Sequence, residues 1–187
     1  MIYPQKISNK KSEQIINILI IISIIVAVVL IIINKLTTPQ IRWSALANCG
    51  IIYTWLTVMY SIKKGTNIAG HVLLQTILIS IVMLYIDKTI GFIGWSVYIG
   101  IPIALIVANI TMLILTMISY KKYIKYAIYQ LMIVLISLMP IILIAKNVIE
   151  LKFLIRTEIE ISVFSLIISL ILCYKDIKEA IIRKIHM

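Results

Sequence analysis

Cysteine, histidine and acidic residues are all scarce in this chain. Its 187 residues include 2 cysteines, 2 histidines and 7 acidic residues. A disulfide needs Cα atoms within about 7 Å of each other, and on the topology argued below Cys49 and Cys173 lie near opposite faces of a membrane. We therefore expect no internal disulfide, and two cysteines alone cannot form a zinc site of the usual four-ligand kind.

The same scarcity limits the chemistry that the chain can perform. His71 and His186 are the only histidines, and the sequence contains no His-Glu-x-x-His, no Gly-x-Ser-x-Gly and no phosphate-binding glycine loop. Asp87 has no second carboxylate deep in another predicted helix, so the paired carboxylates of proton-coupled transporters are missing. We predict a non-enzymatic protein with no catalytic residue, no cofactor and no metal site.

Apolar residues, by contrast, are abundant. They make up 62% of the chain, and the mean hydropathy is +1.10, whereas an ordinary globular chain is about 45–50% apolar. One small domain cannot hide this much apolar surface, so lipid must cover the rest. The composition predicts an all-α, polytopic transmembrane bundle in the cell membrane, with the lipid bilayer as its main surroundings.

The apolar residues form about six runs of membrane-spanning length, which is near 20 residues. The first run is too long for the apolar region of a signal peptide, roughly 7–15 residues. The predicted organisation is a basic lead-in at residues 1–14, a six-helix transmembrane domain at 15–174 and an amphipathic basic tail at 175–187. The predicted spans are residues 15–33, 43–62, 68–86, 95–118, 124–144 and a sixth that begins between 154 and 159 and ends at 174.

The formal net charge of +11 does not indicate nucleic-acid binding, because the basic residues stand in short clusters between apolar runs. With the N-terminus inside, lysine and arginine favour the inner segments by roughly two to one, which predicts that both termini are cytoplasmic. In the tail, Ile177, Ala180, Ile181 and Ile185 recur at helical spacing. We expect a short amphipathic helix on the cytoplasmic surface, with a partner-binding helix as the alternative.

The second and fourth predicted helices begin with the same dipeptide. Trp43-Ser44 opens one and Trp95-Ser96 opens the other, and both helices end in a pair of lysines. Aromatic residues at one interface and lysines at the other are ordinary membrane anchors. A duplicated helical hairpin is the alternative interpretation.

Several short motifs occur in an order that resembles a known family. These motifs are Trp43-Ser44, Leu74-Gln75-Thr76, Ile86-Asp87, Gly91-Phe92-Ile93-Gly94-Trp95-Ser96, Ala108-Asn109-Ile110, Tyr129-Gln130-Leu131 and Ile182-Arg183-Lys184-Ile185-His186. From about residue 12 to the end, the chain resembles uncharacterised small six-helix membrane proteins of low-GC Gram-positive bacteria. Members often carry a zinc ribbon before the first helix, and residues 1–14 of this chain contain no cysteine. The resemblance supports the architecture and implies no mechanism.

Three amides lie within the predicted spans, at Gln75, Asn109 and Gln130. Polar side chains in hydrocarbon are costly, so each needs partners. Their depths are similar, and we expect them to converge inside the bundle. They form either hydrogen bonds between helices or a polar pocket for a small ligand.

Three charged residues are candidates at the outer face: Asp87, Arg156 and Glu160. Asp87 closes the third span, where we expect it to be paired or solvated, with an ion-transport role as the alternative. Arg156 and Glu160 are four residues apart and can pair on one helix face. Together with Glu158 they form either the snorkelling start of the sixth helix or an outer binding patch.

Small residues recur every four positions at Gly100, Ala104 and Ala108, a spacing that allows close helix packing. Pro102 either starts or kinks the fourth helix, and Pro140 is expected to bend the fifth near its outer end.

Taken together, these features predict a membrane scaffold or a regulatory interaction protein, with a membrane protein partner or a homo-oligomer as the expected assembly. The alternative is a small-solute or lipid-related transporter whose polar pocket contains Gln75, Asn109 and Gln130.

Overall fold

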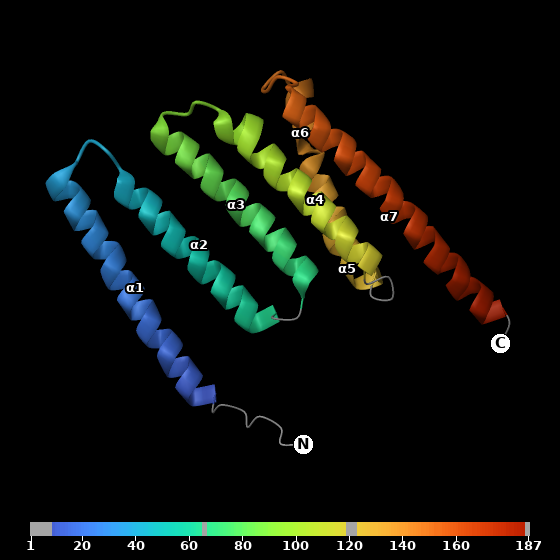
Figure 1. Cartoon of the computed structure of the whole chain (residues 1–187), viewed down its shortest axis with the longest axis horizontal. Helices are drawn as coiled ribbons and strands as arrows, with labels where there is room; N and C mark the ends of the chain where they lie inside the picture. The colour runs from blue at the N-terminus through green and yellow to red at the C-terminus, as the bar shows by residue number, and fades with distance from the viewer. Residues whose placement is uncertain (1–8, 65–66, 119–122, 186–187) are drawn as a thin grey trace. The chain divides into compact units, whose positions relative to one another are not determined.

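Every regular element that the structure describes is a helix (Figure 1). The computed structural model describes residues 9–64, 67–118 and 123–185. The elements are α1 (Asn9–Thr37), α2 (Trp43–Lys64), α3 (Ile68–Ile90), the π-helix η1 (Ser96–Gly100), α4 (Ile101–Ile118), α5 (Tyr123–Ser137), α6 (Met139–Ala145) and α7 (Phe153–Ile185). The predicted all-α fold is confirmed.

Within the described residues, five helical segments are long and apolar enough to cross a membrane. They are Glu13–Thr37, Trp43–Lys63, Ile68–Ile90, Ser96–Ile118 and Ile128–Ala145. This set is compatible with a multi-pass membrane protein. The sixth span, in α7, stays a prediction, as does the orientation of both termini.

The sequence predicts a separate segment at each end of the chain, the basic lead-in at residues 1–14 and the amphipathic tail at 175–187. Residues 9–14 belong to α1, and residues 1–8 lie outside the described part, so the basic lead-in stays a prediction. The backbone of the tail continues α7 without a break as far as Ile185. The side chains of residues 172–187 lie outside the described set, so the surface position of the tail stays a prediction.

The chain divides into two compact units, Met1–Leu56 and Thr57–Met187. In the first unit a single amide organises the turn between α1 and α2. The side chain of Asn34, which is buried, donates from Nδ2 to the carbonyls of Thr38 (2.8 Å) and Ile41 (2.7 Å). Its Oδ1 accepts from the Ser44 backbone N–H (3.2 Å) and hydroxyl (2.7 Å). This buried side chain therefore fixes the start of α2.

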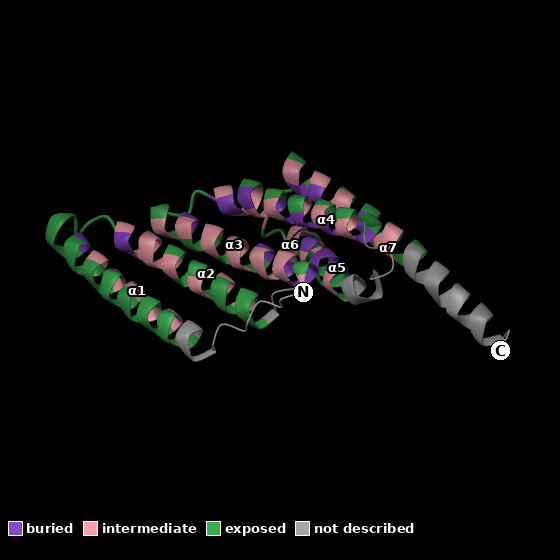
Figure 2. Ribbon diagram, turned by 60° about the horizontal axis from the view of Figure 1, so that its bottom comes forward, coloured by how far each residue is buried: buried purple, intermediate pink, exposed green. Residues whose placement is uncertain are grey.

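In the second unit, α4 is the central helix and packs against α3, α5 and α7. Figure 2 shows buried residues along α4, whereas α1 of the first unit is largely exposed. The principal apolar cluster comes from α3, α4 and α5 and consists of Ala69, Leu73, Ala108, Met112 and Ile133.

The small residues of η1 and α4 face α3. A Cβ added to Gly100 would lie 2.7 Å from the Met83 sulfur and 3.2 Å from the Trp95 ring. Ala108 lies in the apolar cluster, and Ala104 lines the cavity described below. The small-residue stripe thus brings α4 close to α3 within the bundle.

Both prolines mark local changes of helix geometry. Proline has no N–H to donate, so it disrupts the preceding turn. Pro102, in the first turn of α4, follows the wide π-turn of η1, in which the Ile101 N–H bonds to the Ser96 carbonyl. Pro140 lies at the start of α6, which is separated from α5 by a break at Leu138. The break agrees with the bend predicted from Pro140.

Candidate functional site

Asp87 is buried, so of the two positions expected from the sequence, paired or solvated, the structure excludes the solvated one. Its Oδ1 accepts from the backbone N–H of Ile93 (3.0 Å), and its Oδ2 accepts from the N–H of Gly94 (3.1 Å). The Ser96 N–H (3.2 Å) and hydroxyl (2.7 Å) also bond to Oδ2. A carboxylate at the N-terminus of a helix is favoured by its free N–H groups. Asp87 thus stabilises the turn between α3 and η1, and both of its carboxylate oxygens accept hydrogen bonds from that turn.

Glycine is required at two positions of this turn. Gly91 ends α3 with φ of +112°, and Gly94 has φ of +86°, a region that side chains with a Cβ rarely adopt. The positive φ at Gly94 accompanies an N–H that donates to Asp87. The Gly-Phe-Ile-Gly-Trp-Ser motif therefore has a structural explanation.

Asn109 joins three helices at one level of the bundle. It is fully buried on α4, and its Nδ2 donates to the hydroxyls of Ser137 on α5 (2.9 Å) and Ser162 on α7 (3.2 Å). The same nitrogen bonds to the Leu105 carbonyl at 3.0 Å. This first polar layer connects α4, α5 and α7.

Gln130 forms a second polar layer between the same helices. Its Oε1 accepts from the Thr116 hydroxyl of α4 at 3.2 Å, and its Nε2 donates to the Ser165 hydroxyl of α7 at 3.0 Å. Gln130, Thr116 and Ser165 are all buried. Both amides thus act as hydrogen-bonding groups between helices.

Gln75 takes partners from a different helix. Its Nε2 donates to the Thr57 hydroxyl of α2 at 3.0 Å. One turn earlier, His71 meets the Tyr60 ring edge to face, with 4.7 Å between ring centroids. The three amides predicted to converge therefore have separate partners: Asn109 and Gln130 join α4, α5 and α7, whereas Gln75 faces α2.

Gly70 leaves room beside α3 for the Tyr60 side chain of α2. A Cβ added there would clash with the Tyr60 hydroxyl. At the same end of α3, Asn67 accepts from the Gly70 N–H (3.1 Å) as an N-cap and donates to the Tyr129 hydroxyl of α5 (2.6 Å). Asn67 thus joins the start of α3 to α5, and Tyr60 of α2 packs against the same end of α3.

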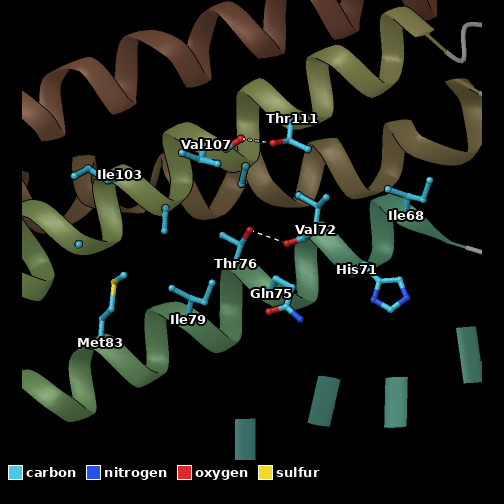
Figure 3. A pocket seen from close by; sticks show the side chains of 13 residues that line it. Ile68, His71, Val72, Gln75, Thr76, Ile79, Met83, Ile103, Val107 and Thr111 are labelled. Atoms are coloured by element: carbon cyan, nitrogen blue, oxygen red, sulfur yellow. Dashed lines mark hydrogen bonds between the residues drawn. The ribbon is translucent and has the colours of Figure 1, made fainter. Parts of the chain in front are cut away.

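A cavity of about 530 Å³ lies between α3 and α4 (Figure 3). It follows α3 from Ile68 to Met83, and on the other side it runs from Gly100 of η1 to Thr111 of α4. Its volume lies in the roughly 300–1,000 Å³ range of ligand pockets. Figure 3 shows His71 near one end of the cavity, Met83 near the other and Gln75 between them.

The remaining outer-face candidates lie at the start of α7. Arg156 Nε donates to Glu160 Oε1 at 2.9 Å, and both side chains are largely exposed. Lys152, just before the helix, places its ammonium 3.7 Å from the centre of the Tyr98 ring. These are single surface contacts, which contribute little to stability.

Glu158 was assigned with its neighbours to the interface, but the structure buries it completely. The serines that complete the amide layers, at positions 137, 162 and 165, were not singled out from the sequence either. One signal was available: Glu158, Ser162 and Ser165 recur at three- and four-residue spacing on one face of α7. Within the searched residues, no group of three or more His, Cys, Asp or Glu side chains could hold a metal ion.

The apolar helices and the buried amide layers define a helical bundle compatible with a multi-pass membrane protein. Residues 3–187 match the model of DUF6320, a family of unknown function, and the chain belongs to that family. This agrees with the resemblance to an uncharacterised family; the bacterial range and the zinc ribbon stay predictions. Neither the curated proteins nor the solved structures contain a match to the chain.

Proposed function

We propose that the protein is a non-enzymatic interaction protein of the membrane that binds the acyl chain of a phospholipid between α3 and α4. The observation that carries the proposal is the cavity of about 530 Å³ along these two helices. The stretch from Ile68 to Met83 corresponds to about 22 Å of helix at 1.5 Å per residue. An elongated cavity of that length suits an extended hydrocarbon chain.

The chemistry of the lining favours a hydrocarbon ligand over a polar solute. Most lining residues are aliphatic. The two threonines use their hydroxyl protons within their own helices, since Thr76 donates to the Val72 carbonyl and Thr111 to the Val107 carbonyl, each at 2.7 Å (Figure 3). Polar ligands need lining groups that can bond to them, and these two hydroxyls are already engaged.

A polar residue lies toward one end of the cavity. His71 lines that end, whereas Gln75 lies midway along the α3 side. The exposed Lys63 closes the apolar segment that precedes α3. A lysine near the membrane surface attracts anionic headgroups, by about 1 kcal/mol per residue. An anionic phospholipid with its headgroup at this end therefore satisfies both the apolar and the polar parts of the cavity.

The polar-pocket alternative receives less support. It requires Gln75, Asn109 and Gln130 to surround one cavity, but the lining includes only Gln75. Asn109 and Gln130 hold helices together through bonds to Ser137, Ser162 and Ser165. A protein partner or a homo-oligomer remains the expected assembly.

Native mass spectrometry of the full-length chain, extracted in mild detergent, tests the proposal. We expect phosphatidylglycerol added during purification to remain on the wild-type chain. Ala104→Leu places a larger side chain in the cavity and should remove most of this bound lipid. Ala145→Leu is the matched control, because Ala145 is exposed at the end of α6 and its substitution should leave lipid binding unchanged.

Thermal unfolding of both variants in detergent separates loss of the lipid from loss of the fold. The proposal fails if a folded Ala104→Leu chain retains as much lipid as the wild type. It also fails if the wild type retains no more lipid than an unrelated helical bundle treated in the same way.

A further inference from the structure

Glu158 is a fully buried carboxylate in the second turn of α7. Neither of its carboxylate oxygens has a hydrogen-bond partner within the described part of the chain. The nearest basic residue in the sequence, Arg156, is exposed and pairs with Glu160 instead. Burying an ionised carboxylate without a partner is very costly. A positively charged ligand at the free oxygens of Glu158 would offset that cost.

A third buried oxygen without a partner lies on the facing helix. It is Oδ1 of Asn109, whose Nδ2 is already engaged by Ser137, Ser162 and the Leu105 carbonyl. Unpaired buried acceptors are uncommon in native proteins, and each needs an explanation. Two neighbouring helices thus present three such oxygens.

Ser162 connects the two residues. Its hydroxyl accepts from Asn109 Nδ2 at 3.2 Å and donates to the backbone carbonyl of Glu158 at 2.8 Å, one turn earlier in α7. Helices α4 and α7 pack together and run in the same direction (Figure 1). Side chains lean toward the N-terminus of their helix, so the Asn109 and Glu158 side chains lean toward the same end of the pair.

We propose that Glu158 and Asn109 form a binding site for a small monovalent cation between α4 and α7. The ligands are the Glu158 carboxylate and Asn109 Oδ1, with the Ser162 hydroxyl oxygen beside them. Hard cations prefer oxygen ligands of these kinds. A single carboxylate neutralises one positive charge, whereas a divalent ion would leave a net charge in apolar surroundings.

A proton would not satisfy the same groups. One proton on Glu158 makes one hydroxyl donor, which can serve at most one further acceptor. Of the three oxygens, one would remain without any donor. A cation coordinates all of them at once, and it would hold α4 against α7 in addition to the amide layers.

Carbodiimide labelling of the purified full-length chain tests the site. N,N′-dicyclohexylcarbodiimide is hydrophobic and converts buried carboxyl groups into stable N-acylureas, which peptide mass spectrometry locates. We expect Glu158 to be labelled in choline chloride and labelled severalfold more slowly in sodium chloride of equal ionic strength and pH. Glu158→Gln removes the labelled peptide and identifies the signal.

The controls separate this site from other carboxylates and from the lipid cavity. Glu160→Gln alters an exposed carboxylate two residues away and should keep the sodium protection, and so should Ala104→Leu in the cavity. Ser162→Ala should weaken the protection without abolishing labelling. Equal labelling in sodium and choline would show that Glu158 binds only a proton. No labelling in either salt would show that the carboxyl group is inaccessible to ligands. Each of these results overturns the proposal.

Discussion

Ser96 donates a hydrogen bond of 2.7 Å from its hydroxyl to the buried carboxylate of Asp87. In the other unit of the chain, Ser44 donates a bond of the same length to Asn34. Each serine follows a tryptophan, and each acceptor lies near the end of the preceding helix. The same arrangement therefore fixes two helical turns, which favours the duplicated hairpin over interface anchoring alone as the explanation of the repeated Trp-Ser pair.

The Asp87 turn should be important for stability. Asp87→Ala removes the acceptor for four donor groups and leaves buried N–H groups unpaired, so we expect a loss of roughly 2–4 kcal/mol in the free energy of unfolding. Ser96→Ala removes a single charge-assisted bond and should cost about 1–2 kcal/mol. Unfolding in mixed detergent micelles measures both. Equal, negligible effects would show that the turn forms without the carboxylate.

The two amide layers should contribute similar and moderate stability. Asn109→Leu and Gln130→Leu each remove interhelical hydrogen bonds, which average about 0.6 kcal/mol and reach about 1.7 kcal/mol in membrane proteins. We expect each variant to remain folded and to lose about 0.5–2 kcal/mol. Because the layers lie at different levels and use different serines, the double variant should show near-additive losses. A large coupling energy between them would contradict two independent layers.

Gly70 should resist even a small substitution. The added methyl of Gly70→Ala meets the Tyr60 hydroxyl and the Asn67 side chain, and overpacking of this kind costs about 1–3 kcal/mol. Gly50→Ala is the matched control, since no atom lies within 4 Å of its added Cβ. That change should be neutral or stabilise α2 by up to about 1 kcal/mol. Reversal of this order in thermal unfolding would refute the close contact at Gly70.

The ion pair at the start of α7 should contribute almost nothing. Arg156 and Glu160 are both exposed, and exposed pairs at this helical spacing contribute about 0.3–0.5 kcal/mol. Replacement of Glu160 by Gln should shift the free energy of unfolding by no more than that. A shift of several kcal/mol would indicate that this pair is buried by another chain in the membrane.

Orientation is predicted from charge alone and can be measured directly. An excess of lysine and arginine on one side predicts cytoplasmic termini. Alkaline phosphatase, which is active only outside the cytoplasm, should be inactive when fused after Met187. Fusion within the turn at Phe92 should give an active enzyme. Activity of the C-terminal fusion would contradict the predicted orientation.

The positions of the helices were largely predictable from the sequence. Apolar runs of spanning length mark the five segments, because a segment in hydrocarbon satisfies its backbone hydrogen bonds within itself only as a helix. The third helix was expected to end at Asp87, yet α3 continues to Ile90. A charge ordinarily marks the membrane edge, but here backbone N–H groups of the following turn surround the carboxylate. Two of these donors, the N–H groups of Ile93 and Gly94, belong to residues outside the predicted spans.

The partners of the polar residues were not predictable in the same way. Asn109 and Gln130 were recognised because amides are uncommon in apolar runs, whereas their partners Ser137, Ser162 and Ser165 are common in transmembrane helices. Glu158 stood between two other charged residues and resembled an ordinary helix end. Its burial depends on which face of α7 meets α4, and this contact joins residues about 50 positions apart in the chain, as in the bond from Asn109 to Ser162.

The sequence by itself determined the all-helical fold, the approximate positions of the apolar helices and the bend at Pro140, because local hydrogen bonding and hydropathy control these features. Only the tertiary structure decided that the three amides divide between two sets of partners and that Asp87 serves a turn. It likewise decided that the side-chain oxygens of Glu158 and Asn109 that lack hydrogen-bond partners lie on two helices packed together, α7 and α4. The physical reason is that the hydrogen-bond partners of a buried polar group lie on other helices. Helix packing, not sequence distance, decides which residues those partners are.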